Sequence, residues 1–336
     1  MSGATIDYEL RPAKNVDRRV FVDLLARSER YLTLADATYV SMGGYPMTDH
    51  RMIHRRLDIE NLVSIDGDPE VVQRQNFNKP TEKCICLHLQ SGELIEDLDD
   101  ILSRNNIDVE ARKVIWLDYT KPNTLDTQLN EFEGLLNKAA EHDIVRITLN
   151  ANNDALKYET GKNLDAMALR NARFQALEKM IGSYLPNGSS PKDLSNSSFP
   201  MLLSKILARA AESAFPPADK FSFFPLSTIA YQDGQRMLTM TGIVIDKINI
   251  QKFLDETGLK QWPFFSSSFD DVNTLRVAVL TMKERMLMER LAVSAKDEKI
   301  GDHLGFQKFA DLKVEDYFED FKGHARFYPT HAQLDL

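Results

Sequence analysis

The sequence predicts an α/β fold, in which a parallel sheet ends in an antiparallel β-hairpin and carries a helical insertion and a helical C-terminal tail. Between residues 37 and 150, short runs rich in Val, Ile and Leu alternate with helical segments, as in βαβ units whose strands are buried on both faces. Two helical patterns interrupt this alternation between 151 and 220. An Asp-Gly pair between two later β-type runs then predicts a hairpin.

The elements follow one another in a simple order. The chain opens with a polar stretch and an amphipathic helix that we expect to end at Asp36 and Ala37. Five strands are expected next, over 37–42, 61–66, 83–89, 113–118 and 143–150. Helices are expected over 124–142, 168–184, 201–215, 250–257 and roughly 272–291, a polar loop over 186–198 and the hairpin over 222–246.

The length of 336 residues is typical of one core domain with a sizeable insertion or tail. We therefore divide the chain into five regions. They are an N-terminal helical segment (1–36), a Rossmann-like cofactor-binding core (37–150), a helical insertion (151–220), the terminal β-hairpin of the core sheet (221–248) and a helical C-terminal region (249–336).

Composition and charge narrow the function classes. The formal net charge of −9 makes binding to nucleic acid through a basic surface a disfavoured function. No run approaches the roughly 18 apolar residues of a membrane span, and the first residues hold no apolar signal core, so we expect a cytoplasmic protein. Cys84 and Cys86 are interpreted as reduced thiols that point to opposite faces of a strand.

Two candidate ligand groups follow the first two strands. Ser41-Met42-Gly43-Gly44 ends the first strand, where glycines let a ligand approach the backbone of an open α/β sheet. A plain tight turn is the alternative. Asp66 ends the second strand about 23 residues later, at the spacing of an acid that accepts the hydroxyls of an adenosine ribose. The alternative is a helix N-cap, which Asp68 before Pro69 fits better.

The fourth strand ends in a possible catalytic group. Asp118 and Tyr119 follow it, so Asp118 could orient a substrate amine, activate a hydroxyl or contact the amino end of a cofactor. The alternative is a loop-capping aspartate with a packed tyrosine.

Two groups of basic residues suggest a ligand or metal site, but a structural interpretation is favoured for each. Arg11, Lys14 and Arg18 share one face of a helix, and this face could close over a cofactor or grip an anionic substrate. We favour a solvated basic face, paired with Asp7, Glu9 and Asp17. His50 and His54 have the spacing of zinc ligands, but no third ligand is apparent, so no metal site is expected.

These features resemble the class I S-adenosylmethionine-dependent methyltransferases. The segments IDYELRPAKNVDRR, YVSMGGYPMTDHRMIHRRL, LVSIDGDP, NFNKP and VIWLDYTKP are similar to an uncharacterised bacterial family labelled putative O-methyltransferases, some members of which are suspected of roles in phage defence. The resemblance covers residues 6–150 best. It implies S-adenosylmethionine as cofactor.

The resemblance also implies roles for individual residues. Gly43 and Gly44, with Ser41, take the place of the cofactor loop, and Asp66 that of the ribose acid. Gln90 and Ser91 fall where methyltransferases contact adenine. Asp118 takes the acid after strand four, with Tyr119 beside it as a catalytic candidate.

The sequence departs from the methyltransferase pattern in two places. The first loop reads S-M-G-G rather than G-x-G-x-G, which leaves loss of activity open. The fourth motif reads L-D-Y-T-K-P rather than N/D-P-P-Y, which makes methylation of bases or amines less favoured.

Three functions remain open. The first is an active S-adenosylmethionine-dependent methyltransferase, O-directed by the resemblance, with an unknown acceptor. The second is an inactive, methyltransferase-like scaffold that binds a nucleotide and acts in a complex. The third, less favoured, is a dinucleotide oxidoreductase. An open cleft near Asp118 would favour the enzyme, and a filled one the scaffold. The helical regions could support a homodimer or bind a protein partner.

Overall fold

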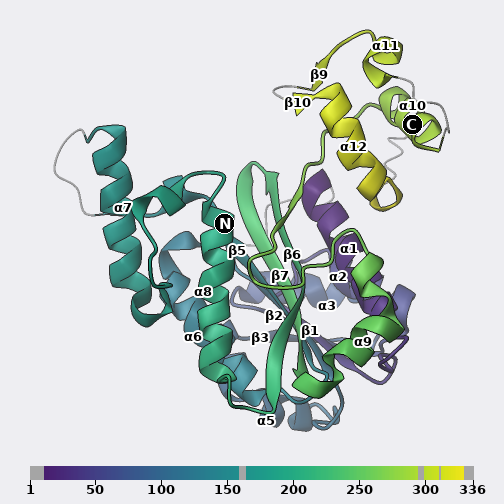
Figure 1. Ribbon diagram of the computed structural model, residues 1–336. Coiled ribbons are helices and arrows are strands. Elements are labelled where there is room, and N and C mark those ends of the chain that lie inside the picture. Colours follow the sequence, from purple (N-terminus) through teal and green to yellow (C-terminus); the bar gives the residue numbers. More distant parts are fainter. Residues whose placement is uncertain (1–10, 159–163, 294–298, 310–311, 329–336) are drawn as a thin grey trace.

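The computed structural model describes residues 11–158, 164–293, 299–309 and 312–328. Its centre is an eight-stranded sheet with the order β3-β2-β1-β4-β5-β7-β6-β8 (Figure 1). The strands are β1 Thr38–Ser41, β2 Asn61–Asp66, β3 Ile85–His88, β4 Lys113–Asp118, β5 Ile144–Asn150, β6 Phe221–Asp233, β7 Gln235–Asp246 and β8 Asn273–Leu275.

The pairing confirms the predicted fold class. The first five strands pair in parallel, whereas β7 runs antiparallel to both β5 and β6. Dinucleotide-binding sheets have the order 3-2-1-4-5-6, so the antiparallel β7 between β5 and β6 distinguishes this sheet from them. The predicted Asp-Gly turn joins β6 to β7, and Gly234 has a φ of 79°, which glycine adopts without strain.

Helices cover both faces of the sheet (Figure 1). Leu, Ile and Phe side chains of α4 to α8 pack against one face, and those of α1, α2 and α9 pack against the other. The helices of these two layers, with α3, are α1 Pro12–Ser28, α2 Thr48–Leu57, α3 Pro69–Asn78, α4 Ser91–Glu96, α5 Leu98–Arg104, α6 Leu125–Lys138, α7 Ala166–Ile181, α8 Phe199–Ala214 and α9 Ile250–Thr257. Among the described helices, none combines the length and apolar character of a membrane span.

The C-terminal region differs from the expected helical tail. Residues 273–275 add β8 to the edge of the sheet beside β6, and the helix expected from 272 begins only at Met282. Thr281 explains this start, because it caps the helix by accepting a hydrogen bond from the Glu284 N–H. The remaining elements are α10 Met282–Ala292, α11 Ile300–Leu304, a small β9–β10 ribbon (Lys308–Phe309, Leu312–Lys313) and α12 Val314–His324. They enclose a separate apolar core.

Two further expectations were wrong. The first helix ends at Ser28 rather than at 36. At this end, the Ser28 hydroxyl donates to the Leu24 carbonyl. Cys84 and Cys86 do not point to opposite faces, since residues i and i+2 of an extended segment share a face. Both cysteines are free thiols.

Candidate functional site

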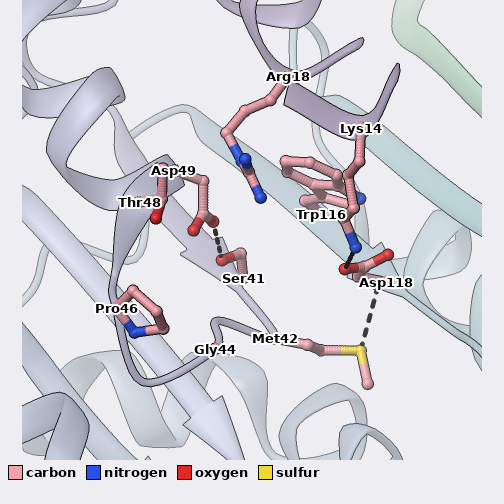
Figure 2. Close-up of a pocket in the computed structure, with 10 residues that line it drawn as sticks. All are labelled: Lys14, Arg18, Ser41, Met42, Gly44, Pro46, Thr48, Asp49, Trp116 and Asp118. Carbon is pink, nitrogen blue, oxygen red and sulfur yellow. Dashed lines mark hydrogen bonds and ion pairs between the residues drawn. The ribbon is translucent and has the colours of Figure 1, made fainter. Parts of the chain in front are cut away.

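A small polar pocket lies where β1 and β4 end, beneath α1 and beside the start of α2 (Figure 2). Its volume is about 20 Å³, which is room for about one water molecule. The residues that line it are Lys14, Arg18, Ser41, Met42, Gly44, Pro46, Thr48, Asp49, Trp116 and Asp118. The pocket therefore gathers charged side chains at the edge of the sheet where ligands of open α/β folds bind.

Helix α1 is fixed above this pocket at two points. Fully buried Asp17 forms an ion pair with Arg146 of β5 and accepts a hydrogen bond from the Thr239 hydroxyl of β7. At the start of the helix, the N–H groups of Ala13 and Lys14 donate to the Asp233 carboxylate at the hairpin tip. The backbone that carries the pocket's two cations is therefore held in place.

Lys14 reaches into the pocket and meets Asp118. Its Nζ lies 2.7 Å from Asp118 Oδ2, and the two side chains are 5% and 16% exposed. The Asp118 N–H donates to Met42 Sδ at 3.3 Å (Figure 2). Asp118 Oδ1 is buried and has no hydrogen-bond partner among the described residues. This carboxylate can thus accept a further donor.

Arg18 enters the same pocket one helical turn later, and its guanidinium points between Asp49 and Trp116 (Figure 2). The residue is only 5% exposed, and its Nε and Nη1 atoms have no hydrogen-bond partner within the described part of the chain. Such buried, unsatisfied cationic donors are costly unless they bind an anion. The geometry therefore indicates an anion-binding position.

The interpretation of a solvated basic face was wrong for Lys14 and Arg18, because both are buried in the pocket. Asp17 pairs with Arg146 and not with this face. Arg11 is half-buried just before α1, while Asp7 and Glu9 lie outside the described residues. Sequence periodicity could not reveal this burial, because the residues that anchor α1 lie on β5, β7 and the hairpin.

A buried network supports the pocket from behind. Asp49 accepts hydrogen bonds from the hydroxyls of Tyr39 (2.7 Å) and Ser41 (2.6 Å), and lies 3.5 Å from His50 Nδ1. Burial raises the pKa of Asp49, but His50, Arg18 and the Ser41 hydroxyl outweigh it and hold that pKa well below its usual range. Burial lowers the pKa of His50, but Asp49 outweighs it and leaves that pKa raised. Sequence reasoning missed Asp49 as a site residue.

The two loop glycines have different surroundings. A Cβ on Gly43 would lie 2.6 Å from Ser64 Oγ and 2.9 Å from His50 Cε1, and the Gly43 carbonyl accepts a hydrogen bond from Gln75. Gly43 is therefore required by close packing. Gly44 lines the pocket instead.

A second group of predicted residues lies at the ends of β2 and β3. Asp68 caps α3 by accepting from the Glu70 N–H, as predicted. Asp66 is half-buried and accepts from the Asp68 N–H at 2.8 Å, and burial raises its pKa. The side chain of Gln90 lies against Gly67, where a Cβ would approach its Nε2 to 2.2 Å. Asp66 and Gln90 thus border the same edge of the sheet.

Tyr119 points away from Asp118. Its hydroxyl donates to Glu131 of α6, and burial raises its pKa strongly, aided by Glu131. The structure therefore joins Tyr119 to α6 rather than to the pocket. Its catalytic role stays a prediction.

The model of a family described as "Putative O-methyltransferase" matches residues 6–336. The chain belongs to this family. No curated protein matches the chain. Family and strand order together identify an S-adenosylmethionine-dependent methyltransferase of the class I fold, as the sequence resemblance predicted, with S-adenosylmethionine as cofactor and the acceptor unknown. The oxidoreductase alternative is not supported.

Several solved structures are distantly similar to this family member. The N-methyltransferase NodS from Bradyrhizobium japonicum WM9 has 9% identity and a TM-score of 0.36, over 69% of this chain and 97% of that one. Trm1 from Pyrococcus horikoshii with S-adenosyl-L-methionine has 13% identity and a TM-score of 0.41, over 73% and 58%. A putative O-methyltransferase from Klebsiella pneumoniae has 12% identity and a TM-score of 0.36, over 67% and 78%.

The two histidines with zinc-like spacing are used within the fold of this family member. His50 Nε2 donates to the Val63 carbonyl, and His54 Nδ1 contacts the Ile59 carbonyl. Over residues 11–158, 164–293, 299–309 and 312–328, no group of three or more His, Cys, Asp or Glu side chains could hold a metal ion.

Proposed function

We propose that this methyltransferase binds S-adenosylmethionine across the ends of β1 to β4 and transfers the methyl group to an oxygen atom of its acceptor. The observation that carries the proposal is the pairing of opposite charges in one pocket. Arg18 presents unsatisfied cationic donors, and Asp118 presents an unsatisfied carboxylate oxygen. The amino-acid end of the cofactor carries a carboxylate and an ammonium group, which these two side chains complement.

The other contacts follow from position. Asp66, half-buried at the end of β2, accepts the ribose hydroxyls. Gln90 and Ser91 border the adenine, and Ser41 and Gly44 line the amino-acid end. Gly43 lets the loop pack on Ser64.

Methyl transfer needs alignment above all. When bound, the cofactor supplies an electrophilic methyl carbon on a sulfonium. The protein holds the acceptor oxygen in line with the carbon–sulfur bond, and such positioning supplies a large part of the rate. The cavity of about 20 Å³ must widen before the methionine end of the cofactor fits, and Asp118 Oδ1 is open to the cofactor's ammonium beside the Lys14 ion pair at Oδ2.

The ion pair between Lys14 and Asp118 favours a second candidate function. A pocket closed by this pair fits an inactive scaffold, in which the helical regions bind a protein partner. Exposed apolar side chains on those helices support such a surface, with Met167 of α7 76% exposed and Met286 of α10 63% exposed. A homodimer through these helices is the simplest version, and light scattering of the purified protein tests it.

The proposal also includes the cellular compartment of the protein and its role in the cell. We infer a cytoplasmic, bacterial protein, supported by the two free thiols and by the sequence resemblance. A role in phage defence rests on that resemblance alone. Plaque counts on cells with and without the gene test it.

Calorimetric titration tests the cofactor site. We expect micromolar binding of S-adenosylmethionine and S-adenosylhomocysteine, no binding of NAD or ATP, and loss of binding in Asp66→Ala. The matched control is Asp68→Ala, which removes the N-cap of α3, keeps the Asp66 carboxylate and costs about 1 kcal/mol of stability. If neither methionine-derived ligand binds, the proposal fails.

A further inference from the structure

A large groove lies beside the tip of the β6–β7 hairpin, at the β8 edge of the sheet. It is bounded by the hairpin tip, the start of α8, the segment 272–279 and the β9–β10 ribbon. Figure 1 shows this ribbon and α12 at the same end of the sheet as the hairpin tip. The volume of the groove is about 1120 Å³, slightly above the range of roughly 300–1,000 Å³ that ligand pockets span. The groove can therefore hold a sizeable organic molecule.

The walls of the groove are mostly apolar and carry no negative charge. Val272, Leu275, Val277, Phe309 and Leu312 are among the residues that line it. None of its lining residues, all of which belong to the described part of the chain, is Asp or Glu, although the whole chain has a net charge of −9. The groove therefore shields an apolar body from water and offers no carboxylate to a cation.

Arg236 supplies an uncompensated positive charge at this groove. The residue is half-buried, and its guanidinium donates to the Asn196 carbonyl and to Gln232 Oε1, which are both neutral. Over the described residues, no carboxylate pairs with it. The other arginine of the groove, Arg276, is paired with Asp320. Arg236 therefore offers a cation to an anionic ligand.

The groove lies near the end of the strand that carries Asp118. The Arg236 carbonyl accepts a hydrogen bond from the N–H of Ala151, just after β5, and β5 pairs with β4, which ends in Asp118. Because neighbouring strands are about 4.8 Å apart, about 10 Å separates the strand of Arg236 from that of Asp118. A ligand held by Arg236 can therefore reach across β5 towards the cofactor.

Tyr231 also connects the groove with the pocket. It lines the groove, is 3% exposed, and its hydroxyl has no hydrogen-bond partner among the described residues. Burial raises the pKa of this hydroxyl, and the nearby carboxylates of Asp17 and Asp118 raise it further. The groove and the pocket of Asp118 are therefore neighbours.

We propose that this groove binds the methyl acceptor, and that the acceptor is an organic anion with an apolar body. Arg236 pairs with the anionic group, the apolar walls cover the body, and the reacting hydroxyl lies at the other end, towards Asp118. The inference rests on the proposed function, which places the cofactor's methyl group near Asp118. During transfer, the hydroxyl oxygen bonds the methyl carbon with a lone pair. The carbon–sulfur bond breaks with its electrons on sulfur, and the hydroxyl proton leaves to water.

Two naphthols that differ by one anionic group test the groove. In 6-hydroxynaphthalene-2-sulfonate the hydroxyl and the sulfonate stand at opposite ends of an apolar body, and 2-naphthol lacks the sulfonate. Calorimetry measures the Kd of both for the full chain saturated with S-adenosylhomocysteine. We expect the sulfonate to bind about tenfold more tightly or better. Arg236→Gln should abolish this preference and leave the Kd of 2-naphthol unchanged. Arg209→Gln, an exposed arginine of α8 outside the groove, should change neither Kd.

Nuclear Overhauser effects between the two bound ligands test the acceptor role. We expect them between the ring protons of the sulfonate probe and the protons on the carbons bonded to the sulfur of S-adenosylhomocysteine. Three results would overturn the inference and leave the cofactor site standing. They are a sulfonate probe that binds no better than 2-naphthol or not at all, an unchanged preference in Arg236→Gln, and no such effect with both ligands bound. Failure of the wild type to bind S-adenosylhomocysteine would overturn the proposed function as well.

Discussion

Replacing Arg18 by methionine should separate binding from stability. Methionine fills a similar volume but removes the guanidinium, whose Nε and Nη1 have no partner among the described residues. A hydrogen bond to a charged group contributes about 1.5–3 kcal/mol, and each 1.4 kcal/mol is about tenfold in affinity. The Kd for S-adenosylhomocysteine should therefore rise about 10- to 150-fold.

The cofactor-free protein should not lose stability in this variant. Arg18 is buried with unsatisfied nitrogens, and a buried polar group without a hydrogen bond costs about 1–3 kcal/mol. Favourable attraction between Arg18 and Asp49 reduces the gain from removing it. We expect the free energy of unfolding to stay the same or rise by up to about 2 kcal/mol.

The assay combines calorimetric titration with urea unfolding of the same samples. Arg19→Met is the matched control, since Arg19 is half-buried on the next helix position and donates to Asn15 outside the pocket. It should leave the Kd within a factor of about two. A variant Arg18→Met that unfolds more easily and binds S-adenosylhomocysteine like the wild type would refute an anion-binding role for Arg18.

Three other variants probe the fold, two of them beside the site and one in the C-terminal core. Asp17→Asn leaves the buried Arg146 cation without its partner and should cost about 3–5 kcal/mol in urea unfolding, which a second change, Arg146→Met, should largely restore. Burial lowers the pKa of His324 to about 4, so protonation favours the unfolded chain. About 3 kcal/mol of stability, complete above pH 6.5, should be lost as the pH falls towards 4, and His324→Phe should abolish this loss in unfolding curves measured across that range. Gly43→Ala places a methyl 2.6 Å from Ser64 Oγ and should cost about 1–3 kcal/mol by thermal unfolding. Gly43→Ala with Ser64→Gly should recover only part of this loss, because the methyl also lies 2.9 Å from His50 Cε1.

Much of the fold follows from local sequence. Five buried strands and the Asp-Gly hairpin could be predicted, because period and turn chemistry act over a few residues. The helix expected from 272 failed because pairing with the edge of β6 outweighs local propensity there. The Thr281 cap then sets where the helix starts.

The candidate site was only partly predictable. Asp66 and Asp118 stand out because they end buried strands, and the structure places both at one edge of the sheet. The sequence predicts that Arg18 is exposed, because its helix looks amphipathic. Its burial could not be predicted, because it depends on contacts with distant strands. The Asp17–Arg146 pair spans 129 residues of sequence, a distance that no local pattern reports.

The contact between the start of α1 and the hairpin tip has a consequence during synthesis. Ala13 and Asp233 are 220 residues apart in the chain. At about 5–20 residues per second, a ribosome takes roughly 10–45 s to add the stretch between them. Throughout that interval the first helix cannot dock at its final position, and its apolar side chains stay available to chaperones. The pocket is therefore among the last parts of the nascent chain to mature.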